Sequence, residues 1–400
     1  PINLAGGNAG DMLARACALG PLLREHAQDN EKAGRLAPEV VQALDAAGMF
    51  GLFAPRSLGG AELMPSQAIP VIEELARNDG SSAWVVFAVC LCTGAAGAYL
   101  GQGAVDALFA RGVPITAGQG IPNGRAFVEP GGYRVQGQWN YGSGVQHASH
   151  VHTGAIVYLP NGSPRLDEHG VPEVRIFYVP REQVQFAGNW DVVGLRATGS
   201  IDYSLPETFV PEESSYAART TRPLRGGALY RMGTIGLGAA GHTAFALGVA
   251  RRTLDELAAF ARTKVGRPGM LGESESFLEG YAQSEASLRA ARALVLQTWT
   301  EAEAALTIDE PLPTRQITQI RLALNHATWT AASVCDYAYR AAGGVSLRSG
   351  PLQRYWRDMH AGTQHVTSSP AILRECGREL LGTAEGKVWA FLGLVDRPRA

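Results

Sequence analysis

The stretch 355–366 holds more groups that could take part in chemistry than any other part of the chain. It reads Tyr-Trp-Arg-Asp-Met-His-Ala-Gly-Thr-Gln-His-Val, with two imidazoles, a guanidinium and a carboxylate. Imidazole changes its charge near neutral pH, so His365 is a candidate to donate or accept a proton. The residues alone leave two interpretations open: a working imidazole, or a structural histidine with satisfied partners.

The spacing within this stretch separates its two histidines. His360 and His365 are five residues apart, about 140° around a helix, so they are not expected to share one ligand. Arg357, Ala361 and His365 fall on one helix face. Because Ser369-Pro370 is typical of a helix start, we expect His365 at a junction between two helices, where a polar side chain can face the interior.

A second histidine cluster has the sequence His-Ala-Ser-His-Val-His and contains His147, His150 and His152. In a strand, the last two share a face and the first points away. A metal site would need a carboxylate or thiolate as well, and none is near in the sequence. The pattern favours surface or interface histidines, and no metal is expected.

Two glycine motifs have structural and functional interpretations. The string Gly-Leu-Gly-Ala-Ala-Gly at 236–241 matches G-x-G-x-x-G, but it lies in a helical region without a βαβ unit. It favours close helix packing over a dinucleotide site. Gly343 and Gly344 follow a predicted helix and could end it. The alternative is a backbone that must approach a bulky ligand.

The hydrophobic pattern changes period twice along the chain, which predicts a mainly α protein with a central β-domain. Helical spacing dominates 1–112, short alternating segments with turns dominate 113–216, and helical spacing returns in 217–400. A chain of 400 residues is long enough for two or three such domains. Strands are expected at 133–135, 151–159, 175–179 and 203–210, and long helices at 247–263, 277–305, 314–340 and 370–381.

Three expectations concern individual segments: a helix cap, a turn and a buried helix. Ser66 is expected to cap a helix over 67–77. Pro-Asn-Gly at 122–124 is expected to form a turn. The helix through Trp84 to Tyr99 is apolar on all sides and should be buried.

Composition and charge exclude several classes of function. The formal net charge of −2 argues against a nucleic-acid partner or an anionic membrane surface. No apolar run is expected to reach the ~18 residues of a membrane span, and residues 1–8 do not resemble a signal peptide. Five cysteines without a metal or redox spacing indicate free thiols in a reducing compartment. A cytoplasmic location is therefore predicted.

Several motifs in a fixed order now resemble one family. They are Leu-Arg-Ala-Thr-Gly-Ser at 195–200, Phe-Val-Pro at 209–211, Leu-Gly-Val-Ala-Arg at 247–251, Ala-Gly-Gly at 342–344 and Arg-Asp at 357–358. Together they are similar to the acyl-CoA dehydrogenase superfamily over nearly the whole chain. The resemblance implies an N-terminal helical domain, a small β-barrel-like domain and a C-terminal four-helix bundle. It also implies a flavin between the β-domain and the bundle, and a homotetramer.

The chain lacks the carboxylate that a dehydrogenase of this superfamily uses to remove an α-proton. Where that base stands after the Arg-Asp pair, this chain has His365. The only acids in 311–374 are Asp336 and Asp358, and the other base position, within 214–254, has none. Dehydrogenation is therefore disfavoured. The segment Trp-Asn-Tyr-Gly-Ser-Gly-Val-Gln-His-Ala at 139–148 instead resembles the flavin-dependent monooxygenase branch, and Arg-Asp-x-His-Ala-x-x-Gln-His its indole-acetate monooxygenase-like members.

This branch implies an oxygenase component that receives reduced FMN or FAD from a separate flavin reductase. With dioxygen it forms a C4a-hydroperoxyflavin and oxygenates a small aromatic, indole-like or polyketide substrate. Two other functions remain open: an acyl-CoA dehydrogenase or nitroalkane-oxidase-like flavoprotein, and a non-catalytic binding member of the fold.

The resemblance also assigns roles to individual residues. His365 and Ser143 are the expected catalytic residues; Trp139, Ser143, Thr198, Ser200, Lys264, Gly343 and Gly344 are the expected flavin-binding residues; Trp84, Phe87 and Cys92 are the expected substrate-binding residues. Aromatic hydroxylases of this group often have a histidine where this chain has Cys92. No histidine lies between His26 and His147, which favours an indole, a polyketide or another substrate over a simple phenol.

Overall fold

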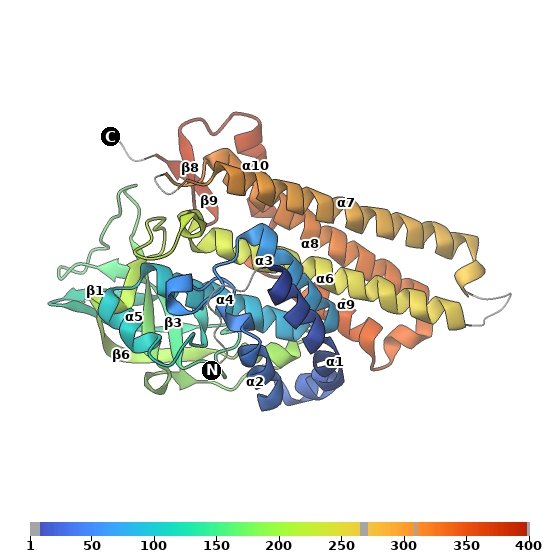
Figure 1. Ribbon diagram of the computed structural model, residues 1–400. Helices are drawn as coiled ribbons and strands as arrows, with labels where there is room; N and C mark the ends of the chain where they lie inside the picture. The colour runs from blue at the N-terminus through green and yellow to red at the C-terminus, as the bar shows by residue number, and fades with distance from the viewer. Residues whose placement is uncertain (1–8, 265–270, 308–309, 398–400) are drawn as a thin grey trace.

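The computed structural model describes residues 9–264, 271–307 and 310–397. A helical N-terminal part, a sheet and a long helical bundle follow one another along the chain (Figure 1). This is the predicted fold class. The N-terminal helices are α1 (Ala9–Ala33), α2 (Pro38–Ala46), α3 (Pro65–Asn78), α4 (Gly80–Tyr99) and α5 (Gln102–Leu108).

The central sheet has seven strands in the order β5-β6-β2-β1-β3-β4-β7. Among the strands that the structure describes, only β1 and β3 pair in parallel. The predicted turn at 122–124 is wrong, because these residues lie inside β1, where the register with β3 shifts between Gln119 and Gly124. The strands are β1 (Thr116–Glu129), β2 (Gly132–Trp139), β3 (His150–Tyr158), β4 (Val174–Pro180), β5 (Gln185–Phe186), β6 (Tyr203–Pro211) and β7 (Ser215–Ala217).

In the described residues, the C-terminal part contains three long α-helices, two shorter ones and two short final strands. The first helix begins at Gly233, 14 residues before the predicted start, because glycine and alanine continue the helical pattern upstream. Helical structure does not persist to the end of the chain as expected, since a two-stranded hairpin follows the last helix. The elements are α6 (Gly233–Thr263), α7 (Glu275–Ala305), α8 (Thr314–Ala342), α9 (Pro351–Thr363), α10 (Pro370–Leu380), β8 (Lys387–Ala390) and β9 (Gly393–Asp396).

Helix α4 lies at the centre of the molecule, between the sheet and the bundle (Figure 1). Contrary to the expectation from the sequence, it is long and apolar enough to span a membrane, with a mean hydropathy of 1.6. It is 89% buried inside the fold, which is typical of a core helix. Only Ala88 and Leu91 along it are partly accessible. They share a helix face with Trp84, so this face is the one open to a small molecule.

Local side chains explain how the helices start and pack. Ser66 does not cap α3; its backbone N–H and hydroxyl both donate to Glu303 of α7, at 2.6 Å. The glycine string on α6 does serve close packing. A Cβ on Gly241 would lie 2.6 Å from Phe87 of α4, so only glycine lets the two helices approach this closely.

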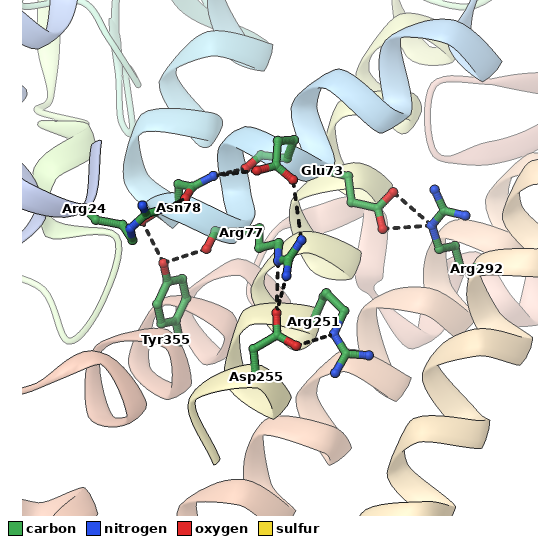
Figure 2. A network of polar contacts seen from close by, with 9 residues as sticks. Arg24, Glu73, Arg77, Asn78, Arg251, Asp255, Arg292 and Tyr355 are labelled. Atoms are coloured by element: carbon green, nitrogen blue, oxygen red, sulfur yellow. Dashed lines mark hydrogen bonds and ion pairs between the residues drawn. The ribbon is translucent and has the colours of Figure 1, made fainter. Parts of the chain in front are cut away.

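A polar network fixes α9 and the bundle against the N-terminal helices (Figure 2). The Tyr355 hydroxyl donates to the carbonyls of Arg77 and Asn78 at the end of α3, at 3.1 and 2.8 Å. Arg77 in turn pairs with Asp255 of α6 at 2.7 Å. The end of α3 leads directly into α4, so the network sets the position of α4 relative to the bundle.

Candidate active site

His365 lies at the predicted junction, between α9 and a short 3-10 helix, Val366–Ser368. Its side chain caps that turn: Nδ1 accepts a hydrogen bond from the backbone N–H of Thr367, at 3.4 Å. The Thr367 hydroxyl lies 2.8 Å from the same nitrogen. The imidazole is therefore held in one orientation by its own turn.

Those contacts also decide which nitrogen of His365 has the proton. Nδ1 accepts a hydrogen bond from a backbone N–H, so this nitrogen is unprotonated. A neutral ring with an unprotonated Nδ1 has its hydrogen on Nε2. Burial lowers the pKa of His365 to about 4, so the ring is neutral at pH 7. His365 therefore presents an N–H donor to whatever faces Nε2.

A second imidazole, which the sequence did not lead us to expect here, faces His365. His242 of α6 lies with its ring centroid 3.8 Å from that of His365, at an interplanar angle of 35°. Burial and the neighbouring His365 lower its pKa well below the usual value. A signal was present: His242 is the only ionisable residue in 233–250.

Aromatic side chains surround the imidazole pair. Trp84 lies 4.9 Å from the ring of His242 and 6.0 Å from that of His365. Phe87 contacts His242 at 4.6 Å, and Phe245 packs edge-on against Trp84 at 4.9 Å. The structure thus brings the predicted substrate residues Trp84 and Phe87 together with His365. An apolar surround of this kind excludes water and keeps both imidazoles neutral.

Cys92 does not join this group. Its thiol points to His152 on β3, with Sγ 3.8 Å from Nε2, and it is buried on the side of α4 that faces the sheet. Burial also raises the pKa of the thiol well above its usual value. The predicted substrate contact of Cys92 is therefore not supported, because the face that meets the imidazole pair lies roughly a quarter-turn away.

A chain of hydroxyl groups connects Trp84 to the loop before β6. The Trp84 indole N–H donates to Ser143 Oγ at 3.1 Å, and Ser143 Oγ lies 2.7 Å from Ser200 Oγ. Ser200 Oγ in turn lies 2.7 Å from Thr198 Oγ1, whose hydroxyl donates to the carbonyl of Leu195 at 2.7 Å. The structure thus brings together three of the residues predicted to bind flavin. Ser143 is the partly accessible member, and the other two are buried behind it.

This arrangement fits a flavin ring. The polar edge of an isoalloxazine needs both donors and acceptors, and a serine hydroxyl can be either. Ser143 lies at the border of the sheet and α4, directly beside the aromatic and imidazole groups. Ser143 would hold the ring edge, while Thr198 and Ser200 fix the direction of its hydroxyl.

Asp358, from the Arg-Asp pair, fixes the loop that contains these hydroxyls. Its carboxylate Oδ1 accepts a hydrogen bond from the backbone N–H of Leu195 at 2.6 Å. The loop also lies directly on α9, since a Cβ on Gly194 would be 2.1 Å from the carbonyl oxygen of Arg357. Asp358 is 2% exposed, and burial raises its pKa to about 7. It is therefore a structural clamp that positions Thr198 rather than a base that faces a substrate.

Trp139 lies in the sheet and not at the site. Its indole is fully buried, stacks on Tyr203 at 5.6 Å and donates from Nε1 to the carbonyl of Gly154 at 2.9 Å. A Cβ on Gly124 would lie 2.4 Å from this ring. The expectation that Trp139 lines the flavin is wrong, because the ring fills the core of the β-domain and has no accessible face.

The other predicted cofactor residues lie at the far end of the bundle. Lys264 is exposed at the end of α6, 22 residues beyond His242, which is about 33 Å at 1.5 Å per residue. Gly343 and Gly344 are exposed at the end of α8, where the φ of +61° at Gly343 suits glycine and ends the helix. A Cβ on either glycine would meet nothing within 4 Å. Their flavin contacts stay a prediction, and within one chain they are far from His365.

Comparison with known proteins agrees with this geometry. Residues 14–104 match the model of the acyl-CoA dehydrogenase N-terminal domain, and 240–370 match that of the C-terminal domain. The chain belongs to the acyl-CoA dehydrogenase family. The two matched ranges contain α4, α9 and the part of α6 from residue 240 onward, the helices that place Trp84, His365 and His242.

Its relatives within this family include monooxygenases. An indole-3-acetate monooxygenase of Pseudomonas putida is 27% identical over 389 residues, which cover 92% of this chain and 95% of that protein. The flavin-dependent monooxygenase oxygenase subunit HsaA of Mycobacterium tuberculosis is 29% identical over 383 residues, covering 91% and 93%. The structure of XiaF from Streptomyces sp. in complex with FADH2 and glycerol superposes with a TM-score of 0.85 at 25% identity, covering 94% and 96%.

Proposed function

We propose that this protein is a flavin-dependent monooxygenase, the oxygenase component of a two-component system. The observation that carries the proposal is the pair of neutral imidazoles, His242 and His365, which lies beside the contact between Trp84 and Ser143. His365 stands at the position where a dehydrogenase of this family needs a carboxylate. Its relatives named monooxygenases and hydroxylases support the same reaction class. The cofactor is a reduced flavin, FMN or FAD, and the oxygenating species is a C4a-hydroperoxyflavin.

The residues of the site have separable tasks. A bound reduced flavin supplies two electrons to dioxygen. Ser143 holds the polar edge of the flavin ring, with its hydroxyl oriented by Ser200 and Trp84. Trp84 and Phe87 exclude water and form a flat apolar surface for a small aromatic or indole-like substrate. His365 presents its Nε2–H as a hydrogen-bond donor to the oxygen that is transferred.

Dehydrogenation of an acyl-CoA is not favoured by the site. Asp358, a nearby acid, is buried and hydrogen-bonded to the loop at Leu195. Asp336, on α8, binds His360 and the Trp356 indole, both at 2.8 Å. Neither is free to abstract an α-proton, and a neutral imidazole of lowered pKa is a weak base for a thioester. No observation favours a non-catalytic binding role over the enzyme.

The assembly and partners are part of the same proposal. The name oxygenase subunit of a relative supports a separate reductase. We propose a homotetramer in the cytoplasm. In it, Lys264 and the exposed Gly343-Gly344 end of the bundle would serve the flavin of another copy, since they are too far from His365 of their own chain.

Flavin-binding preference tests the proposal. Titrations of the purified protein with oxidised and with anaerobically reduced FMN and FAD should show that the reduced form binds at least ten times more tightly. The protein should also be isolated largely colourless. Tightly held oxidised FAD that an acyl-CoA bleaches under anaerobic conditions would instead establish a dehydrogenase.

A further inference from the structure

His242 is the least satisfied titratable group in the site. Within the ranges that the structure describes, neither ring nitrogen of His242 has a hydrogen-bond partner. The imidazole is half-buried among Trp84, Phe87 and His365. Its nitrogens are not among the fully buried atoms without a partner, so they remain accessible to a bound molecule. An accessible imidazole nitrogen without a protein partner can accept a hydrogen bond or a proton from a molecule bound in the site.

His365 cannot itself accept a proton at the nitrogen that is free. Its Nδ1 already accepts from Thr367, and its Nε2 therefore has the hydrogen. In the neutral ring, His365 is a donor toward the substrate side. A substrate that must lose a proton from O–H or N–H needs a different acceptor, and the neighbouring ring of His242 is 3.8 Å away.

We propose that His242 is the proton acceptor for the substrate, and that the substrate is an aromatic molecule with an ionisable ring O–H or N–H. The inference rests on the proposed monooxygenase function and divides the work of the imidazole pair. His365 donates a hydrogen bond, and His242 takes the proton. The aromatic contacts of His242 with Trp84 and Phe87 place the substrate ring beside both imidazoles.

The step balances with the reactants of the proposed reaction. The O–H or N–H bond of the substrate breaks, its proton goes to His242, and its electron pair enters the aromatic ring. A ring carbon forms a bond to one oxygen atom of dioxygen. The O–O bond breaks, the reduced flavin supplies two electrons and two protons, and the second oxygen atom leaves as water. The C–H bond at the oxygenated carbon then breaks, which restores the aromatic ring, and the substrate oxygen or nitrogen regains a proton. The proton transfer to His242 precedes oxygen transfer and is favoured because the substrate anion lies between the Nε2–H of His365 and the protonated His242, which both stabilise its charge.

The surroundings favour transfer of a single proton. The ring neighbours of His242 are Trp84, Phe87 and His365, and no formal charge is among them. The one electrostatic contribution to its lowered pKa is from His365. A substrate anion formed between the two rings would be stabilised by the Nε2–H of His365 and by the newly protonated His242.

The test uses 4-nitrophenol, whose anion absorbs visible light and whose neutral form does not. The probe is titrated from pH 5 to 9 while bound to the anaerobic complex of the protein with reduced flavin. Wild type should bind it as the anion, with an apparent pKa at least one unit below that of the free probe. His242→Gln should return the apparent pKa to the free value or above it. His150→Gln, which removes a histidine of the sheet surface, should behave as wild type.

A second variant of His242 keeps the result interpretable. His242→Phe preserves the ring packing without a nitrogen and should match His242→Gln, which shows that the effect is due to the base and not to a packing defect. A probe that stays neutral on wild type, or that ionises equally on both variants, overturns the proposal. Failure of the proposed monooxygenase function would give a different result. The wild-type protein would then transfer no oxygen to any aromatic substrate, although it still ionises the bound probe.

Discussion

Replacing Asp358 by Asn should make the protein more stable at pH 8, although it removes a buried hydrogen-bonding carboxylate. The carboxylate is 2% exposed, and burial raises its pKa from 3.8 to about 7. A raised pKa in the folded state means that the acid stabilises the fold when protonated and that this contribution is lost as pH rises from about 4 to 7. At 1.36 kcal/mol per unit, the loss is about 4 kcal/mol by pH 8.

The expected change in melting temperature follows from the size of the chain. Unfolding entropy of about 2.1 cal/mol/K per residue gives roughly 0.8 kcal/mol/K for 400 residues. A gain of about 4 kcal/mol therefore raises the Tm by about 5 °C. The asparagine amide oxygen can still accept from Leu195 N–H, so the 2.6 Å contact that positions the loop is kept.

The assay is thermal unfolding of Asp358→Asn and wild type at pH 5 to 8, at one protein concentration and without flavin. The two Tm values should differ least at pH 5, by about 2 °C, and separate further as pH rises, with the variant higher. Asp336→Asn is the matched control, because that acid is half-exposed and pairs with His360. A variant that melts below wild type at pH 8 would mean that the charge is paired and stabilising, for example by Arg354, and would refute the reasoning.

The remaining predictions concern flavin binding and oxygen transfer. Ser143→Ala removes the acceptor of the Trp84 N–H, and should weaken binding of reduced flavin by about 10-fold, as expected for about 1.4 kcal/mol, in an anaerobic titration. His365→Ala should retain flavin binding but lose product, with hydrogen peroxide formed instead, in an assay that measures both; normal turnover would make the residue structural. Because burial lowers the pKa of His365 to about 4, the yield of product per flavin should be constant from pH 6 to 8 and fall only as pH approaches 4. A fall between pH 7 and 6 would contradict a neutral imidazole.

Short sequence patterns predicted much of the fold and part of the site. The Ser369-Pro370 helix start and the change in hydrophobic period located helices and the sheet, because capping and side-chain periodicity are properties of short segments. The replacement of a carboxylate by His365, read against the family resemblance, indicated oxygen chemistry. Ser143, Thr198 and Ser200 were predicted from the same resemblance and lie together in one hydroxyl chain.

What the sequence did not predict depends on contacts between distant segments. His242 joins the site only because α6 packs against α4 and α9, and its spacing in the sequence gives no indication of His365 as a partner. Trp139 has the residue type of a flavin-lining group, yet its place over Gly124 and Tyr203 in the sheet buries it. Ser66 has the right position for a cap, but the carboxylate of Glu303 competes for it. These outcomes are decided by tertiary packing.

Rapid mixing of the reduced-flavin complex with dioxygen tests the central claim most directly. A monooxygenase should show a transient absorbance of an oxygenated flavin, distinct from the reduced and oxidised forms, that decays with product when an aromatic substrate is present. Direct return to oxidised flavin without that transient, together with reduction of bound FAD by an acyl-CoA, would contradict it.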